Sequence, residues 1–346
     1  MDGAGLPVDP GILACWLNER GLGEGDVSDA RALTGGTQNI LLAFRFCGRS
    51  MVLRRPPLHA QTDGNGVIER EARILAALVD TDVPHPRFIA GCRDTGLIGA
   101  AFYVMEAVEG FNAHVELPSP FSEARDLRHR MGLSVVDCIA RLGAQDYRAL
   151  GLGDFGRPDN FLGRQVRRWR TQLDSYARYE GWPGLAALGD VDGVGRWLDA
   201  HMPREQAPGL IHGDVHLANM LFRHDLPEVA ALVDWELSTV GDPLVDLGWL
   251  LGHWPDENGN GAATTGARPW DGFPTKDELV ARYAERSGRD VSAIAWYAVL
   301  ACYKRAAIIE GTYARACAGM FSMETGGELH RRAVALVARA QGFIAT

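Results

Sequence analysis

The chain has 346 residues, 47% of them hydrophobic, which is enough to bury one large core or two coupled ones. Its formal net charge of −9 argues against the broad basic surface that nonspecific nucleic-acid binding requires. It contains no apolar run long enough to span a membrane, and the segment after Met1 lacks the basic and apolar blocks of a signal peptide. We therefore expect a cytoplasmic protein without nucleic-acid or membrane partners.

The N-terminal part of the chain is predicted to be rich in strands. A short helix over Ile12–Arg20 precedes two apolar runs, Asn39–Phe46 and Ser50–Arg55, and the intervening Cys47-Gly48-Arg49 predicts a hairpin. Apolar residues then recur at helical spacing over Val67–Val79, and Ala101–Glu106 is a further apolar strand. Strands, one helix and more strands make up this predicted region.

The pattern becomes helical after Glu109-Gly110, and a second region is predicted to be mainly α. Two short strands, around Met220–Phe222 and Ala231–Val233, interrupt the helices and are expected to carry Asn219 and Asp234. The glycine-rich and proline-rich segment Gly252–Phe273 is predicted to be an irregular loop. The predicted helices cover Leu133–Leu142, Val166–Tyr179, Val194–His201, Leu244–Leu251, Leu279–Arg286, Ala293–Glu310 and Leu329–Ala340.

Three polar residues within and after the string HGDVHLAN are spaced as a phosphotransferase requires. Asp214 can orient a hydroxyl and accept its proton, and Asn219, five residues later, can offer a neutral oxygen to a metal ion. Asp234, in Val233-Asp234-Trp235-Glu236, can supply a hard anionic ligand. Asp214 is therefore the predicted catalytic base, and Asn219 and Asp234 are the predicted ligands of Mg²⁺.

The segments Ile211–Phe222 and Leu232–Leu251 resemble the catalytic loop and metal-binding strand of the aminoglycoside phosphotransferase and choline kinase families, relatives of the protein kinases. The resemblance is closer still to the kinase-like domains found alone in bacteria or joined to acyl-CoA dehydrogenases. It implies an α+β, bilobal, protein-kinase-like fold. Residues 1–108 would form a small β-rich lobe with one helix that binds nucleotide. Residues 109–346 would form a larger, mainly helical lobe with the catalytic loop, the metal site and the acceptor pocket.

The same resemblance implies a nucleotide site in the N-terminal lobe. The family's phosphate-covering loop corresponds to Gly35, Gly36, Thr37, Gln38 and Asn39, whose glycines would let backbone N–H groups approach phosphate. Arg54 stands where the family usually has lysine, with Val52 on the same strand face for adenine. Both lysines of the chain, Lys276 and Lys304, follow Asp234, and Arg55 is the alternative to Arg54.

The remaining nucleotide contacts are also implied by the family. Glu71, from the predicted helix, would pair with Arg54. Met105 would lie at the back of the adenine pocket, and the Glu106 carbonyl and Val108 N–H would bind the base. ATP is the expected nucleotide, and GTP remains an alternative because backbone atoms do the binding.

The string Gly153-Asp154-Phe155-Gly156 precedes the catalytic loop and is interpreted as a surface turn. Asp246 is expected to brace the catalytic loop.

The acceptor is predicted to be a small molecule with a hydroxyl group, because the short stretch after Asp234 leaves no room for a peptide-binding segment. Aminoglycoside-like, choline-like and hydroxyacyl-CoA-like acceptors all stay open, as does the choice between a monomer and a homodimer. Two other functions are weighed: a nucleotide-binding pseudokinase, favoured by Arg54, and a zinc hydrolase built on His212 and His216. Candidate pocket residues are Trp254, Asp256, Glu257, Trp270, Tyr303, Arg305, Glu310 and Tyr313.

Overall fold

The computed structural model describes residues 6–33, 39–57, 63–256, 259 and 266–345. The chain divides into two compact units. The first comprises Met1–Glu109 together with Ala230–Glu236, and the second comprises Gly110–Val229 and Leu237–Thr346. The segment that carries Asp234 therefore belongs to the first unit although it lies far along the sequence.

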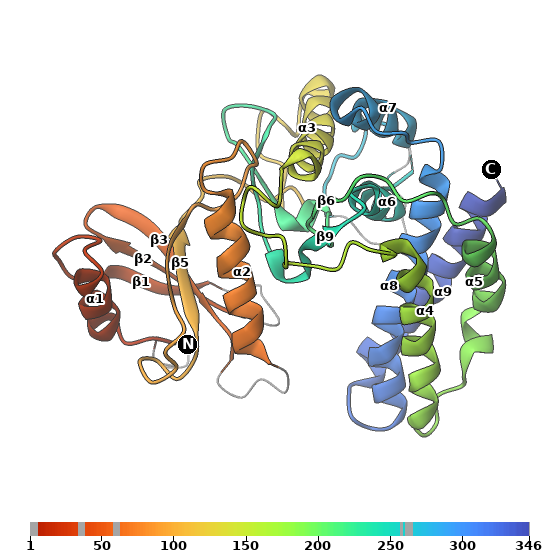
Figure 1. The fold of residues 1–346 in the computed structure, drawn as a ribbon, viewed down its shortest axis with the longest axis horizontal. Helices are drawn as coiled ribbons and strands as arrows, with labels where there is room; N and C mark the ends of the chain where they lie inside the picture. The colour runs from red at the N-terminus through yellow and green to blue at the C-terminus, as the bar shows by residue number, and fades with distance from the viewer. Residues whose placement is uncertain (1–5, 34–38, 58–62, 257–258, 260–265, 346) are drawn as a thin grey trace. The chain divides into compact units, whose positions relative to one another are not determined.

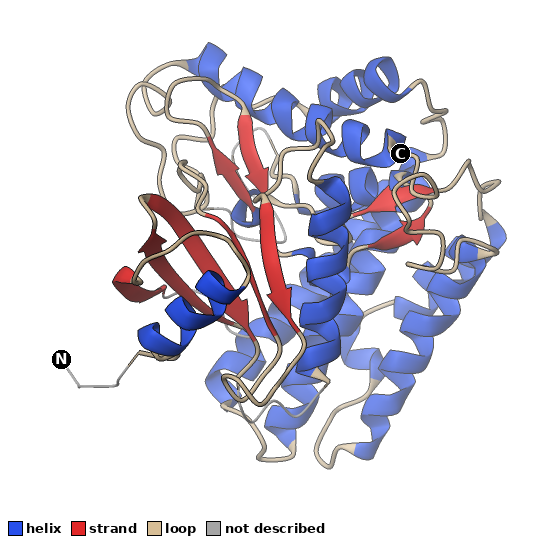
Figure 2. Ribbon diagram, turned by 60° about the vertical axis from the view of Figure 1, so that its left-hand side comes forward, coloured by secondary structure: helices blue, strands red, loops and turns tan. Residues whose placement is uncertain are grey.

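A five-stranded antiparallel sheet forms the centre of the first unit. Its strands lie in the order β1-β2-β3-β5-β4 (Figures 1 and 2). Cys47 and Gly48 make the two-residue turn between β2 and β3, both with positive φ, which matches the twist of a tight hairpin. The strands are β1 (Ser28–Leu33), β2 (Ile40–Phe46), β3 (Arg49–Arg55), β4 (Phe88–Cys92) and β5 (Phe102–Glu106).

Strand alternation gives this sheet two different faces. On one face Met51, Leu53 and Val104 pack with Leu13 and Leu17 of helix α1 (Pro10–Glu19) in one apolar cluster. The opposite face presents Val52, Arg54 and Tyr103 to helix α2 (Gly64–Leu78). The sheet thus separates the polar side chains on this face from the apolar core on the other.

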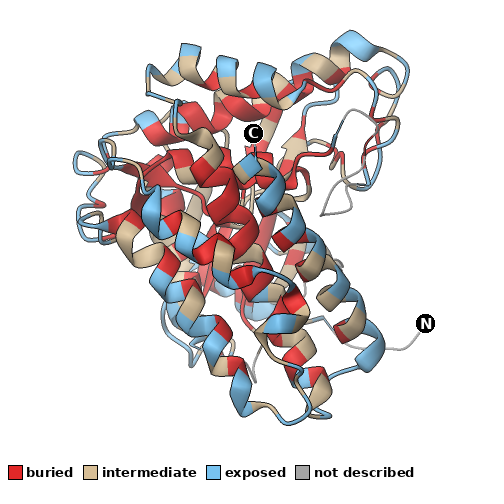
Figure 3. Cartoon of the chain, turned by 90° about the vertical axis from the view of Figure 1, so that its right-hand side faces the viewer, coloured by how far each residue is buried: buried red, intermediate tan, exposed pale blue. Residues whose placement is uncertain are grey.

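The second unit is mainly helical. Helix α8 packs against α4, α5, α6 and α9, while α3 packs against α7 (Figure 1). Buried residues gather on the inward sides of these helices and exposed ones mark their outer sides (Figure 3). The helices are α3 (Arg125–Ala144), α4 (Phe161–Asp174), α5 (Val191–Ala200), α6 (Leu244–His253), α7 (Lys276–Ser287), α8 (Ile294–Cys317) and α9 (Met323–Ala345).

Short elements surround the predicted catalytic loop. Strand β6 (Gly209–Ile211) leads into it and pairs with β9 (Thr239–Gly241), and the 3₁₀ turn η3 (Leu217–Asn219) ends it. Strands β7 (Met220–Phe222) and β8 (Val229–Leu232) follow, and η4 (Trp235–Leu237) comes after Asp234. The prediction that strands carry Asn219 and Asp234 is therefore wrong in detail: Asn219 lies in η3, and Asp234 lies beyond the end of β8.

The predicted α+β class, with strands early and helices late, is confirmed. Of the elements without a sequence prediction, β1 and β4 have mostly intermediate or exposed side chains, and β6 and β9 span three residues each. Several helices extend beyond their predicted ends: α3, α8 and α9 each gain residues. The segment Gly153–Gly156 is a turn, as predicted, but the Phe155 side chain is buried, so the segment does not lie wholly on the surface. Within the described residues, no helix combines the length and apolar character needed to cross a membrane.

Candidate active site

The catalytic loop is fixed to helix α6 by a buried carboxylate. Asp246 accepts hydrogen bonds from the backbone N–H groups of His212, at 2.7 Å, and Gly213, at 2.8 Å. Gly213 has φ +87°, and a Cβ atom there would lie 2.6 Å from the Leu237 carbonyl oxygen, so only glycine fits. The predicted bracing role of Asp246 is confirmed.

Asp214 is oriented by donors from two different segments. The indole Nε1 of Trp249, one turn beyond Asp246 on α6, donates to Asp214 Oδ1 at 3.0 Å. Asn219 Nδ2 donates to Asp214 Oδ2 at 3.1 Å and to the Asp214 backbone carbonyl at 3.0 Å. Since the amide nitrogen of Asn219 is engaged with Asp214, its Oδ1 is the atom that could bind a metal ion.

Neighbouring side chains favour the ionised form of the Asp214 carboxyl. His216 Nε2 lies 3.4 Å from Oδ2, and Arg305 Nη1 lies 3.9 Å from Oδ1. Burial raises the pKa of Asp214, but the hydrogen bond and charge of His216, with Arg305 and His212, outweigh it and hold this pKa below its usual range. The carboxylate is therefore charged at neutral pH.

Lys304 supports the loop from helix α8. Its Nζ donates to the Gly213 carbonyl at 3.0 Å and lies 4.1 Å from the centroid of the Trp249 ring and 5.7 Å from that of the Trp169 ring. Burial lowers the pKa of Lys304 to about 8, while Asp214 and Asp246 oppose that shift. The same indole that donates to Asp214 therefore also packs against this ammonium group.

In the first unit, Arg54 contacts two carboxylates, those of Glu71 and Asp234. The contact with Glu71 is the one predicted for an arginine that stands where the family usually has lysine. Its Nη2 is 2.9 Å from Glu71 Oε1 and 2.6 Å from Asp234 Oδ1, and its Nε is 2.8 Å from Glu71 Oε2. Tyr103 donates to Glu71 Oε2 at 2.8 Å. Burial opposes protonation, yet Tyr103, Glu71 and Asp234 together raise the pKa of Arg54. Burial raises the pKa of Glu71 to about 7 against the opposing effect of Arg54.

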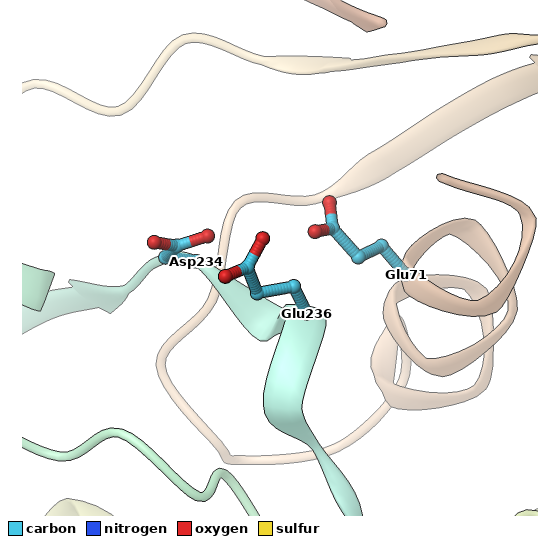
Figure 4. A group of neighbouring side chains, drawn as sticks. All are labelled: Glu71, Asp234 and Glu236. Carbon is cyan, nitrogen blue, oxygen red and sulfur yellow. The ribbon is translucent and has the colours of Figure 1, made fainter. Parts of the chain in front are cut away.

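A third carboxylate, Glu236, joins Glu71 and Asp234. Figure 4 shows these side chains directed toward one another, and one oxygen from each lies within 4.8 Å of the others. Asp234 has φ +67°, a strained left-handed conformation for a residue with a side chain. Carboxylate oxygens are hard donors of the kind that suit Mg²⁺. The sequence analysis assigned no role to Glu236, although an acidic residue two positions after Asp234 could have been considered as a further metal ligand.

The structure places the other predicted nucleotide residues in the first unit. Val52 is buried beside Arg54 on the face of β3 opposite α1, and it pairs in register with Met105. No described residue hydrogen-bonds to the Val108 N–H, whereas the Glu106 side chain pairs with Arg49 at 2.6 Å. Asn39 directly precedes β2; Gly35, Gly36, Thr37 and Gln38 lie outside the described residues. Arg55 instead donates to the Pro7 carbonyl at 2.7 Å, which leaves Arg54 as the residue that faces Glu71.

A cavity of about 230 Å³ in the second unit lies beside Asp214, because His216 and Arg305 both line it and both contact that carboxylate. Among the candidate acceptor residues, Trp254 and Arg305 line this cavity. Trp270 and Asp256 line a neighbouring cavity, and Pro255 lines both.

Three other candidates lie elsewhere, and Glu257 falls outside the described residues. Glu310 accepts from Trp182 Nε1 and contacts His330, and Tyr313 stacks on His330. Tyr303 lines a different groove, between α4 and α5.

Comparison with known proteins gives one consistent result. The model of the phosphotransferase enzyme family matches residues 29–297. Mouse acyl-CoA dehydrogenase family member 10 is 31% identical over 84% of this chain, but the match spans only 27% of that longer protein. A crystal structure of a candidate aminoglycoside phosphotransferase from Ralstonia eutropha is 29% identical, with a TM-score of 0.79 over 96% of this chain and 97% of that one.

The fold is shared more widely than the sequence. An aminoglycoside phosphotransferase solved with AMP-PNP and hygromycin B has a TM-score of 0.59 at 17% identity, covering 95% of this chain and 99% of that one. The predicted kinase-like fold is thereby confirmed. Asn219 and Asp234 belong to different compact units, so their joint metal role stays a prediction.

Proposed function

Since the chain belongs to the phosphotransferase enzyme family, we propose that it transfers the γ-phosphoryl group of ATP, with Mg²⁺, to a hydroxyl group of a small molecule. The observation that carries this proposal is the environment of Asp214. Its carboxylate is ionised, is held by Trp249 and Asn219, and lies at the edge of a cavity. A carboxylate that served only to cap a turn would need none of these features.

In the proposed reaction, Asp214 accepts a hydrogen bond from the acceptor hydroxyl and orients its oxygen toward the γ-phosphorus. A bond forms between that oxygen and phosphorus while the bond to the β,γ-bridging oxygen breaks, so ADP leaves with the bond's electron pair. The hydroxyl proton passes to the Asp214 carboxylate and then to solvent. Proton transfer by a positioned group typically contributes about 10² to 10⁴ in rate.

The first unit supplies the groups proposed to hold nucleotide and metal. Val52 would pack on the adenine, the Val108 N–H would bind its edge, and Arg54, braced by Glu71, would bind the α and β phosphates. Asp234 and Asn219 would bind Mg²⁺, and the carboxylate of Glu236 lies close enough to Asp234 to contribute. When bound, Mg²⁺ would neutralise charge on the phosphates. GTP could replace ATP because the contacts to the base come mainly from the backbone.

The relatives suggest acyl-chain chemistry for the acceptor. The matched mouse protein is named as an acyl-CoA dehydrogenase family member, whereas the structurally similar enzyme was solved with hygromycin B. At about 230 Å³ the cavity beside Asp214 is small for a whole aminoglycoside but can hold one end of a longer acceptor, with the neighbouring cavity available to the rest. A hydroxyacyl acceptor is accordingly favoured.

The test combines nucleotide binding with transfer. Wild-type protein is incubated with Mg²⁺ and ATP or GTP, first in a thermal-shift assay and then with a panel of hydroxylated acids, acyl thioesters, amino sugars and amino alcohols analysed by mass spectrometry. We expect stabilisation by nucleotide, and phosphorylated product with wild type but not with Asp214→Asn. Stabilisation without any product would favour a nucleotide-binding regulatory module. No stabilisation by either nucleotide in folded protein would refute the proposed function.

A further inference from the structure

The cavity beside Asp214 has a marked excess of cationic and imidazole groups. His114, His216, His253, Arg305 and Arg332 supply its polar lining. No carboxylate of the described residues belongs to this lining, and the Asp214 carboxylate lies beside it, in contact with His216 and Arg305. The similar structure solved with hygromycin B is named an aminoglycoside phosphotransferase, and aminoglycosides carry ammonium groups. A cation placed against Arg305 would be repelled, because like charges a few Å apart interact strongly in a partly buried site.

Arg305 is the group best placed to bind a ligand. About two-thirds of its side chain is buried, and its guanidinium makes no hydrogen bond to any described residue. Asp214 is its nearest carboxylate, and at 3.9 Å this is the outer limit of an ion pair. A guanidinium has five N–H donors in a planar fork that fits a carboxylate, so a donor group of this kind at a cavity wall is suited to an anion.

His253 adds a hydrogen-bond acceptor to the lining of the cavity. The Nδ1 of this buried side chain lies 2.6 Å from the Trp249 carbonyl, which can only accept, so Nδ1 carries the proton and Nε2 is an acceptor. Burial lowers the pKa of His253 to about 3, and neighbouring Arg305 acts in the same direction, so the ring is neutral. Nε2 has no partner among the described residues. The cavity thus combines a cationic fork with a neutral hydrogen-bond acceptor.

We propose that this cavity binds an acceptor whose reactive hydroxyl is separated by only a few bonds from an anionic group, the chemistry of a hydroxy carboxylate, with the anion held by Arg305. The short spacer follows from geometry. Arg305 Nη1 and Asp214 Oδ1 are 3.9 Å apart, so one small molecule can place an anion on the fork and a hydroxyl on the carboxylate at the same time. Apolar contact would come from Leu217, Leu250 and Trp254.

This inference rests on the proposed function only in taking the hydroxyl of the ligand as the group that is phosphorylated. Binding of the ligand itself can be measured without nucleotide. Three probes of similar size differ in charge: 3-hydroxybutyrate, its amide 3-hydroxybutanamide, and the amine 4-aminobutan-2-ol. Ligand-detected NMR would measure the affinity of each for wild type, Arg305→Met, Arg305→Lys and Arg331→Met. Arg331 is an exposed residue of α9, outside the cavity lining, and its replacement makes the same change in net charge.

We expect wild type and Arg331→Met to bind 3-hydroxybutyrate at least about tenfold more tightly than the amide or the amine. Arg305→Met should lose this preference, and Arg305→Lys should keep part of it. Failure of wild type to bind 3-hydroxybutyrate, or equal binding of the amine, would overturn the inference without requiring any variant to fold. Unchanged selectivity in a folded Arg305→Met protein would overturn it as well.

The two proposals fail in different ways. Selective binding of 3-hydroxybutyrate without transfer of phosphate from Mg²⁺ and ATP, to it or to any larger hydroxy acid, would support the anion site and refute the phosphotransferase. Transfer to neutral or cationic alcohols with the same efficiency as to hydroxy acids would support the phosphotransferase and refute the anion site.

Discussion

Removing the Arg54 guanidinium should strongly destabilise the first unit. Substitution by Met keeps much of the side chain's length but removes the guanidinium that pairs with Glu71. The Glu71 side chain has no exposed surface, and Tyr103 would remain as its hydrogen-bond donor. Breaking a buried ion pair by removing one partner typically costs about 3 to 5 kcal/mol. We expect Arg54→Met to lower the free energy of unfolding by this amount at about pH 8 in the absence of nucleotide.

The cost should depend on pH in a defined direction. The folded-state pKa of Glu71 is already raised to about 7, and loss of Arg54 removes a group that lowers it. A carboxyl group with a raised folded-state pKa contributes most to stability when it is protonated, and this contribution is lost as the pH rises through the folded-state pKa. The destabilisation by Arg54→Met should therefore be smaller at pH values below that pKa than above it.

Urea denaturation provides the assay, with Arg49→Met as the matched control on the same strand. Arg49 pairs with Glu106 on the surface, with 48% and 40% of the side chains exposed, so its loss should cost at most about 1 kcal/mol. The double variant Arg54→Met/Glu71→Leu should be more stable than Arg54→Met alone, because it also removes the fully buried Glu71 carboxyl that loses its partner. Equal destabilisation by Arg54→Met and Arg49→Met would refute the reasoning.

Three further predictions concern the active-site groups. Trp249→Phe removes the N–H donor to Asp214, so we expect the transfer rate to fall about tenfold and the acidic limb of the pH–rate profile to move upward, which a general loss of packing would not cause. Asp246→Asn should destabilise the protein by about 2 kcal/mol through loss of an acceptor for a loop N–H, as measured by denaturation. Burial raises the pKa of Asp246 to about 6. The difference in the free energy of unfolding between wild type and this variant should therefore decrease as the pH rises through that value. Glu236→Gln should raise the Mg²⁺ concentration needed for ATP-induced thermal stabilisation, and an unchanged requirement would exclude Glu236 as a ligand.

Local spacing made much of the site predictable. Asp214 and Asn219 lie in one short loop, so their proximity followed from spacing. The family resemblance implied that Asp246 braces this loop from the next helix. The contact between Arg54 and Glu71 was also predictable, because the resemblance supplied the pairing that helical periodicity left open. The structure adds the bond from Arg54 to Asp234, which no local pattern contains.

The groups around Asp214 were harder to foresee because they meet through tertiary packing. Trp249 is 35 residues from Asp214 and looked like an ordinary core residue of an apolar helix. Lys304 reaches the Gly213 carbonyl from α8, 91 residues away. Strands such as β1 escaped prediction for a related reason: its side chains are mostly exposed and show no strict alternation, and its pairing with β2 is set by backbone hydrogen bonds.

The most direct test of the central claim is single-turnover transfer from ATP labelled in its γ-phosphate, once an acceptor has been found. Transfer and nucleotide affinity would be compared in wild type and Asp214→Asn under the same conditions. We predict that the variant binds nucleotide as wild type does, because the proposed nucleotide contacts lie in other residues. Its transfer rate should fall by about 10² to 10⁴. Transfer at the wild-type rate by folded Asp214→Asn would show that Asp214 is not the base and would contradict the account.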